Sequence, residues 1–222
     1  AQASAERGHE FAAVYLRLSL NLNETPASQL ALGQTLDRAG LSAASRTAYS
    51  RVGTEDPVLY ATARAQLAAG LQEEGRPEDA LAELRRAAEA APDDQRIALM
   101  LAGQLMTVEK NAEALEILNG PLLNREGQTA QVHFLRGAAY EALDRVPEAE
   151  AELWAAVQAA PEDADMLNYL GYLWVDRDLR VQQGAEMIQR ALTLEPENGN
   201  IQDSLGWAQY RQGDYSAAVD SL

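Results

Sequence analysis

Cysteine is absent from the 222 residues, which excludes disulfide bonds and thiolate metal sites. Aromatic residues make up only 6% of the chain, and alanine dominates its apolar part. No apolar run approaches the roughly 18 residues that a membrane-spanning helix needs. Runs of alternating β-branched residues are missing as well, so strands are not expected. An alanine-rich interior instead favours closely packed helices, and we expect an all-α fold.

Basic residues are in the minority, with 18 Lys and Arg against 34 Asp and Glu, so the net charge is −16. This sign repels phosphate backbones and anionic membranes, which argues against a nucleic-acid partner. A basic protein partner is compatible with it. The alternative is an acidic exterior that serves only solvation.

Catalytic and cofactor motifs are missing too. The chain contains no H-E-x-x-H, no P-loop, no G-x-G-x-x-G and no G-x-S-x-G. The acidic pairs at 93–94 and 162–163 follow prolines and are read as charges at helix starts rather than as metal ligands. His133 is expected to be a half-buried structural residue. We therefore predict no enzyme, no cofactor and no metal site.

A repeat runs through the sequence. Small anchor residues are followed four positions later by a bulky residue, seven later by a small one and, in four copies, twelve later by a proline. Those prolines, Pro57, Pro92, Pro161 and Pro196, are expected to end second helices. The anchors are 34 or 35 residues apart and comprise Ser45, Ala80, Ala114, Ala149, Gly184 and Ala218.

A helix–turn–helix period of about 34 residues is typical of tetratricopeptide repeats, and the chain resembles a protein of that family over residues 26–222. The resemblance implies a right-handed superhelical α-solenoid of antiparallel helix pairs. Its repeats are expected at 26–60, 61–94, 95–129, 130–163 and 164–198, with a partial copy at 199–222. Residues 1–25 are expected to hold the second helix of a preceding partial repeat. Since both ends fall inside repeats, we expect a part of a longer array.

Glycines and two irregular turns refine this prediction. Gly33, Gly137, Gly171 and Gly206 fall inside first helices, where a neighbouring helix must come close. Gly40, Gly75 and Gly213 fall at turns, where a left-handed backbone is needed. The third repeat is expected to end early, in a bent connection at 119–128, and segment 176–180 carries one extra residue. Such irregularities either mark a partner site or only adjust the pitch of the array.

The candidate binding residues come from the resemblance, which implies that first helices line a concave groove. Large aromatic side chains there supply contact area, and an amide can bind an extended backbone. Trp174 is expected to pack instead, and the absence of groove lysines argues against acidic chaperone tails. The residues predicted to face a partner are Met106, Phe134, Asn168, Tyr172, Val175, Asp203, Trp207, Tyr210 and Arg211.

The segments 167–172 and 203–207 are more specific than the generic repeat. They resemble a group of bacterial cell-envelope tetratricopeptide lipoproteins, one type of which is an adaptor of a periplasmic carboxyl-terminal processing protease. The resemblance implies a periplasmic location, with anchoring to the outer membrane through a preceding lipoprotein signal. A cytoplasmic location is the alternative.

Together these features predict a non-catalytic scaffold that binds a partner protein or peptide, with a periplasmic protease and its substrates as the implied partners. Two alternatives stay open. The array could be the regulatory arm of an enzyme whose catalytic domain lies elsewhere in a longer protein. It could also be a structural solenoid that self-assembles through its open ends, which leaves the oligomeric state undetermined.

Overall fold

A computed structural model of the chain describes residues 24–124 and 129–221. Within these ranges every regular element is a helix, namely twelve α-helices and one short 3-10 helix, without a strand. The predicted all-α fold class is therefore confirmed. The second helix predicted for the preceding partial repeat falls on residues 1–23 and lies outside the described residues. Among the described helices, none is both long and apolar enough to cross a membrane.

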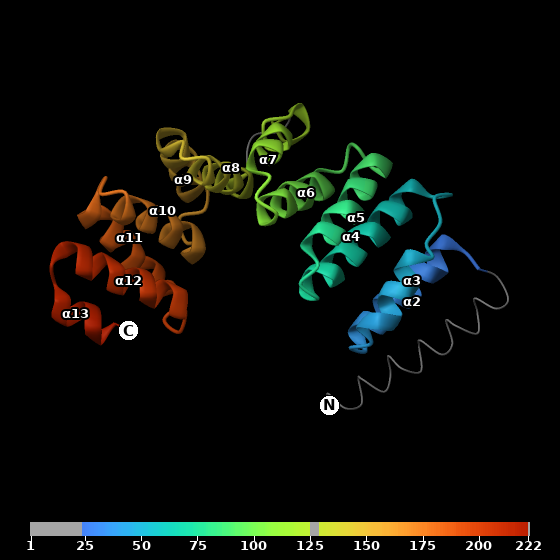
Figure 1. The fold of residues 1–222 in the computed structure, drawn as a ribbon, viewed down its shortest axis with the longest axis horizontal. Helices are drawn as coiled ribbons and strands as arrows, with labels where there is room; N and C mark the ends of the chain where they lie inside the picture. The colour runs from blue at the N-terminus through green and yellow to red at the C-terminus, as the bar shows by residue number, and fades with distance from the viewer. Residues whose placement is uncertain (1–23, 125–128, 222) are drawn as a thin grey trace. The chain divides into compact units, whose positions relative to one another are not determined.

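The chain divides into two compact units, residues 1–117 and 118–222. Neighbouring helices pack in antiparallel pairs, for example α4–α5, α8–α9 and α10–α11 (Figure 1). The first unit contains α2 (Pro26–Arg38), α3 (Ser42–Ser50), α4 (Pro57–Glu73), α5 (Pro77–Ala90), α6 (Gln95–Thr107) and α7 (Asn111–Leu118, whose last residue begins the second unit). The second contains η1 (Pro121–Asn124), α8 (Ala130–Ala142), α9 (Val146–Ala159), α10 (Ala164–Asp176), α11 (Val181–Leu194), α12 (Gly199–Gln212) and α13 (Tyr215–Asp220).

Each first helix ends in the same left-handed turn. The N–H of the left-handed residue donates to the carbonyl oxygen of the residue three positions earlier. The N–H of the following residue donates to the carbonyl oxygen five positions before it. Both bonds satisfy carbonyls at the end of the helix. In the turn after α8, for example, Asp144 N donates to Glu141 O (2.8 Å) and Arg145 N to Tyr140 O (2.9 Å). The prediction for three glycines is confirmed, but three further turns use residues with a side chain. Among the described residues, those with positive φ are Gly40, Gly75, Glu109, Asp144, Asp178 and Gly213.

Prolines mark most helix boundaries as expected. Pro92, Pro161 and Pro196 each follow the end of a second helix, at α5, α9 and α11. The expectation for Pro57 is wrong, because α3 ends at Ser50 and Pro57 is the first residue of α4. The first turn of a helix tolerates proline, since its missing N–H has no intrahelical partner there.

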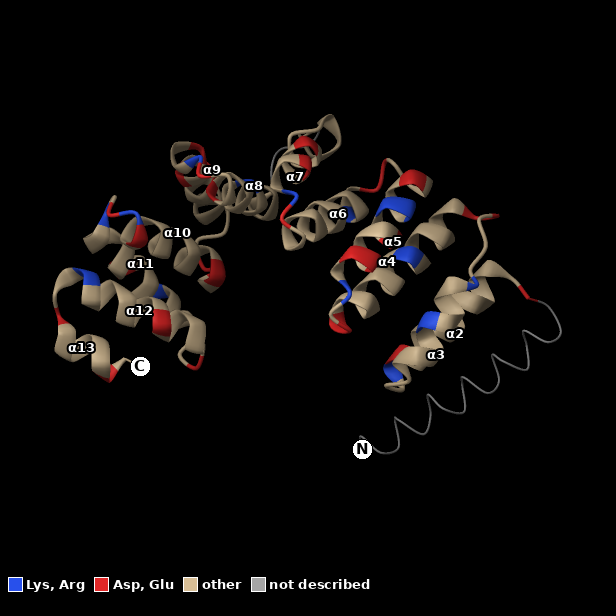
Figure 2. Cartoon of the chain, viewed as in Figure 1, with Lys and Arg blue, Asp and Glu red and all other residues tan. Residues whose placement is uncertain are grey.

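Acidic side chains open several of the helices (Figure 2). Asp56, Asp94 and Asp163 occupy the N-cap positions of α4, α6 and α10, where each accepts hydrogen bonds from backbone N–H groups of the first turn. The acidic pairs at 93–94 and 162–163 therefore lie at helix starts, as predicted. Among the described residues, no cluster of three or more His, Cys, Asp or Glu is placed to hold a metal ion.

Helices α10 and α11 cross at very short range, with a glycine on each side. A Cβ atom added to Gly171 would lie 2.8 Å from the carbonyl oxygen of Gly184, and one added to Gly184 would lie 2.5 Å from that of Gly171. The two helices therefore touch backbone to backbone. Gly33 and Gly137 likewise face the side chains of Tyr49 and Leu153 at distances no Cβ could occupy. For these three first-helix glycines the predicted close approach is confirmed.

The irregular third repeat ends early, as predicted, because α7 ends at Leu118 and η1 follows. The side chain of Arg136 in α8, which is 3% exposed, binds to this connection by hydrogen bonds. Its guanidinium donates to Leu118 O (2.9 and 3.2 Å) and to Asn124 Oδ1 (2.6 Å), so the last carbonyl of α7 is satisfied by a charged side chain. His133 lies beside it, half-buried, with its Nδ1 2.6 Å from Glu152 Oε2 of α9.

Candidate protein-binding surface

The predicted binding residues lie on the first helices α6, α8, α10 and α12, and those of the second unit concentrate on α10 and α12. Tyr172, Asp203 and Tyr210 are exposed, whereas Asn168, Trp207 and Arg211 are partly buried. We call the exposed side of these two helices the first-helix face. Met106 is partly buried on α6 in the other unit.

A row of three aromatic rings lies on this face. Trp207 and Tyr210 stack with centroids 5.5 Å apart and planes 14° from parallel. The ring of Tyr215 in α13 lies 5.3 Å from that of Tyr210 and is tilted by 59° against it. Tyr210 and Tyr215 are 51% and 62% exposed, so a large apolar area faces solvent. The sequence analysis missed Tyr215, although its separation of five residues from Tyr210 across a glycine turn could have indicated the contact.

Arg211 has a structural task on the same helix. Its guanidinium donates to the carbonyl of Asp176 (2.9 Å), pairs with the carboxylate of Asp178 (3.5 Å) and lies 5.6 Å from the ring of Trp207. These contacts tie the end of α12 to the turn after α10. The guanidinium also lies over the Trp207 ring, which helps to position its stack with Tyr210.

Two polar atoms of the first-helix face are buried without a hydrogen-bond partner among the described residues. They are Oδ1 of Asn168 and Nε1 of Trp207, an acceptor and a donor on neighbouring first helices. An unpaired buried polar group costs about 1–3 kcal/mol.

Val175 does not belong to the surface, and its prediction is wrong. It is fully buried, and its Cγ2 lies where a Cβ on Gly184 would clash. The tight α10–α11 crossing turns this position inward.

Phe134 also faces inward in part, since its ring meets that of Tyr169 edge to face at 5.1 Å. Tyr169 was missed by the sequence analysis. It donates to Glu141 Oε2 (2.6 Å), and burial together with this carboxylate raises the pKa of Tyr169 above its ordinary range. The contact joins the end of α8 to α10.

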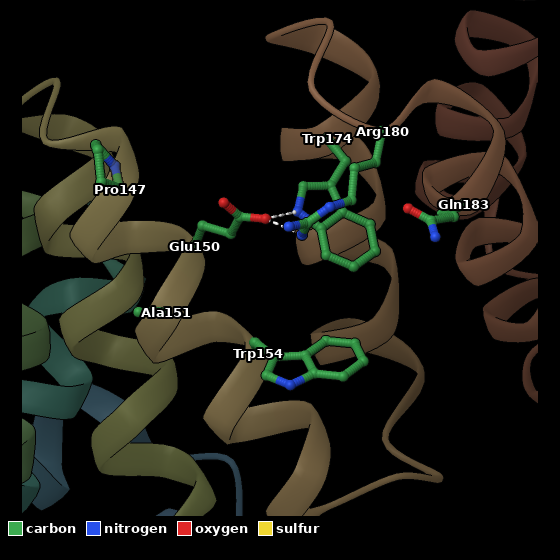
Figure 3. A pocket seen from close by; sticks show the side chains of 7 residues that line it. All are labelled: Pro147, Glu150, Ala151, Trp154, Trp174, Arg180 and Gln183. Carbon is green, nitrogen blue, oxygen red and sulfur yellow. Dashed lines mark hydrogen bonds and ion pairs between the residues drawn. The ribbon is translucent and has the colours of Figure 1, made fainter.

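A separate pocket of about 410 Å³ opens between the second helices α9 and α11 (Figure 3). Trp154 projects into it from α9, and the ring of Trp174 enters from the end of α10. The other lining residues are Pro147, Glu150, Ala151, Arg180 and Gln183. We call this cavity the two-tryptophan pocket.

Hydrogen bonds fix one wall of the two-tryptophan pocket. Trp174, which is 4% exposed, donates from Nε1 to Glu150 Oε1 (2.8 Å), and Arg180 pairs with the same oxygen. The Arg180 guanidinium also lies 4.9 Å from the Trp174 ring centre. The packing role predicted for Trp174 is thus confirmed. Trp154, which the sequence analysis missed, is 45% exposed and lies 5.8 Å from Trp174.

The turn before α11 explains the position of Arg180. In four other turns the left-handed residue directly precedes the N-cap of the next helix, as Gly40 precedes Leu41. After Asp178, an extra residue, Leu179, intervenes before the N-cap Arg180. The predicted extra residue therefore lies beside the two-tryptophan pocket.

Two family models of the tetratricopeptide repeat match the chain, one over residues 71–138 and the other over residues 176–222. The TPR repeat-containing protein PA4667 of Pseudomonas aeruginosa is 27% identical over 193 residues, which are 86% of this chain and 32% of that relative. The chain thus spans about a third of the length of this relative.

Solved structures are similar as well. That of MamA from Desulfovibrio magneticus RS-1, from residue 41 to its end, is 24% identical with a TM-score of 0.60 and covers 76% of this chain and 93% of its own. A tetratricopeptide repeat protein from Parabacteroides merdae has a TM-score of 0.77 at 14% identity and covers 98% of this chain and 86% of its own. At these identities the likeness shows the shared fold alone.

Proposed function

Since the chain is a tetratricopeptide repeat protein, we propose that it is a non-catalytic adaptor that binds a partner protein through the first-helix face of α10 and α12. The matching families indicate no enzymatic activity. The observation that carries the proposal is the row of Trp207, Tyr210 and Tyr215, in which both tyrosines are exposed. Tyr and Trp are the residues most enriched among interface hot spots.

The stack is rigid before any partner arrives, which favours binding. Ring–ring contacts on both sides of Tyr210 and the cation–π contact of Arg211 limit the rotamers of these side chains. A preorganised anchor loses less conformational entropy on association. Tyr172, 42% exposed on α10, extends the apolar area toward the preceding repeat.

Charge defines the kind of partner. The second unit carries seven arginines and no lysine against 17 carboxylates. Its field attracts basic segments and repels acidic ones, which affects association rates most at low salt. The partner is therefore a protein whose contact segment combines apolar residues with Lys or Arg.

We further propose that the protein acts in the bacterial cell envelope, as an adaptor between a carboxyl-terminal processing protease and its substrates. The support is the likeness of segments 167–172 and 203–207 to envelope lipoproteins of that type. Fractionation of cells that produce the full-length protein tests the location. Purified periplasmic carboxyl-terminal processing protease from the same organism tests the partner, because a saturable complex must form without any other protein.

The face itself is tested with a photo-crosslinking amino acid placed at Tyr210, with Leu194 as the matched control position. Leu194 is 42% exposed but lies at the end of the second helix α11. We expect a discrete adduct from position 210 and none from 194. The adduct should disappear when Tyr172→Ala and Tyr215→Ala are combined, while far-UV circular dichroism stays unchanged. Equal adducts from both positions, or an adduct that survives the double substitution, would show that another surface binds.

A further inference from the structure

One tryptophan of the two-tryptophan pocket, Trp154, departs from the repeat that surrounds it. At its position, five residues after the anchor, the other copies carry the polar residues Ser50, Arg85, Asn119 and Gln189. Trp174 instead occupies a core position, four residues before the left-handed turn residue, where the other copies carry Leu36, Leu71, Leu105, Tyr140 and Gln209. The helix pairs therefore form without an indole at the position of Trp154. The fold does not require that half-exposed side chain, so a different demand accounts for it.

The floor and one wall of the pocket are apolar. Pro147, Ala151 and Trp154 lie on one side of α9 at helical spacing, and the Trp174 ring faces them from α10 (Figure 3). Its volume of about 410 Å³ falls within the range of small-ligand sites, roughly 300–1,000 Å³. Trp154 nevertheless stays 45% exposed, so the pocket is open and a side chain can enter from the surface.

The polar rim of the pocket offers one free acceptor. Trp174 Nε1 and Arg180 both use Oε1 of Glu150, and the described part of the chain supplies no donor to Oε2. The Arg180 guanidinium is held by this pair and by the Trp174 ring. A Lys or Arg side chain that reaches Oε2 would form a charge-assisted hydrogen bond with this oxygen.

We propose that the two-tryptophan pocket is a second binding site, which takes one large apolar side chain of a partner protein with a flanking Lys or Arg on Glu150. The apolar side chain packs between Trp154 and Trp174, over Ala151. The flanking cation is favoured by the free Oε2 and by the excess of carboxylates in this unit. The site lies between the second helices, so the adaptor can hold this partner while the first-helix face holds another. It stands independently of the function proposed above.

Fluorine NMR of the 222-residue chain labelled with fluorotryptophan tests the site directly. The three tryptophan signals, from Trp154, Trp174 and Trp207, are assigned by substituting each with Phe in turn. The probes are three blocked heptapeptides with Gly and Ser flanks that differ only in their centre, Arg-Phe-Arg, Arg-Ala-Arg or Glu-Phe-Glu. Arg-Phe-Arg is expected to shift the Trp154 signal saturably at millimolar concentration. The affinity of the other two peptides should be lower by at least about tenfold.

Two variants separate the pocket from general attraction. Trp154→Ala removes an exposed side chain and should abolish binding of Arg-Phe-Arg while the Trp207 signal stays in place. Glu150→Gln keeps an acceptor for Trp174 and should reduce the preference for Arg-Phe-Arg over Glu-Phe-Glu severalfold. Equal binding of Arg-Ala-Arg, binding that survives Trp154→Ala, or no saturable shift with any peptide would each overturn the proposal. None of these outcomes bears on crosslinking at Tyr210, so the two sites are tested separately.

Discussion

The crossing of α10 and α11 predicts that the same substitution has opposite effects at two glycines. Gly184→Ala adds a methyl group where Gly171 O would lie 2.5 Å away and Val175 Cγ2 2.8 Å away. The first obstacle is backbone, which cannot rotate aside, so the two helices must separate. Gly103→Ala, in the middle of α6, adds the same group where no atom lies within 4 Å.

The magnitudes follow from two opposing contributions. Alanine stabilises a helix interior by about 0.5–1 kcal/mol relative to glycine, at either site. Overpacking a close-packed interior costs about 1–3 kcal/mol, and a backbone obstacle places Gly184 at the upper end. We therefore expect Gly184→Ala to lower the free energy of unfolding by about 1–2 kcal/mol. Gly103→Ala should raise it by about 0.5–1 kcal/mol.

Native-state amide hydrogen exchange is the suitable assay, because repeat arrays can unfold in parts and a single melting temperature can hide a local change. Protection of the α10 and α11 amides should fall in Gly184→Ala, whereas protection of the α6 amides should rise in Gly103→Ala. Gly171→Ala should resemble Gly184→Ala, because its Cβ would meet the same backbone at 2.8 Å. If Gly184→Ala raised protection as Gly103→Ala does, the backbone contact at this crossing would be refuted.

Two other predictions concern titration and turn strain. Tyr169→Phe removes the hydroxyl that donates to Glu141 and should cost about 1 kcal/mol at neutral pH. Since the folded pKa of Tyr169 is raised above its unfolded value of 10.0, that stability is complete below pH 10 and is lost as pH rises further. Exchange of α10 amides should thus become less sensitive to alkali in the variant; an unchanged alkaline profile would contradict this. Glu109→Gly relieves a left-handed backbone at φ 61 and should stabilise the turn after α6 by up to about 1 kcal/mol, measured by urea unfolding, with loss of stability as the contrary result.

Much of the fold could be predicted from sequence because its determinants are local and repeated. The anchor spacing, the prolines after second helices and the glycines at three turns each act within a few residues of chain. Glu109, Asp144 and Asp178 escaped prediction because nothing in a single residue marks a left-handed backbone when the side chain is not glycine. Their register was the usable signal, because consecutive turn residues are 34 or 35 residues apart.

The binding residues were harder to place because exposure depends on how neighbouring helices cross. A helical-position rule put Val175 on the surface, but the α10–α11 contact at Gly184 buries it. The same rule predicted that Arg211 contacts a ligand, whereas its guanidinium donates to the carbonyl oxygen of Asp176 beside the turn after α10. Tyr172 and Tyr210 are exposed, as a residue that contacts a partner must be.

The two-tryptophan pocket was invisible to reasoning within one repeat, because its parts come from two successive repeats. Glu150 and Trp154 belong to one, and Trp174 and Arg180 to the next. The extra residue Leu179 then fixes where Arg180 enters, so an apparent irregularity of the turn becomes part of the site. Comparison of equivalent positions across copies would have singled out Trp154, since it separates what every repeat needs from what one repeat adds. In an array whose copies fold alike, such additions are where function must be sought.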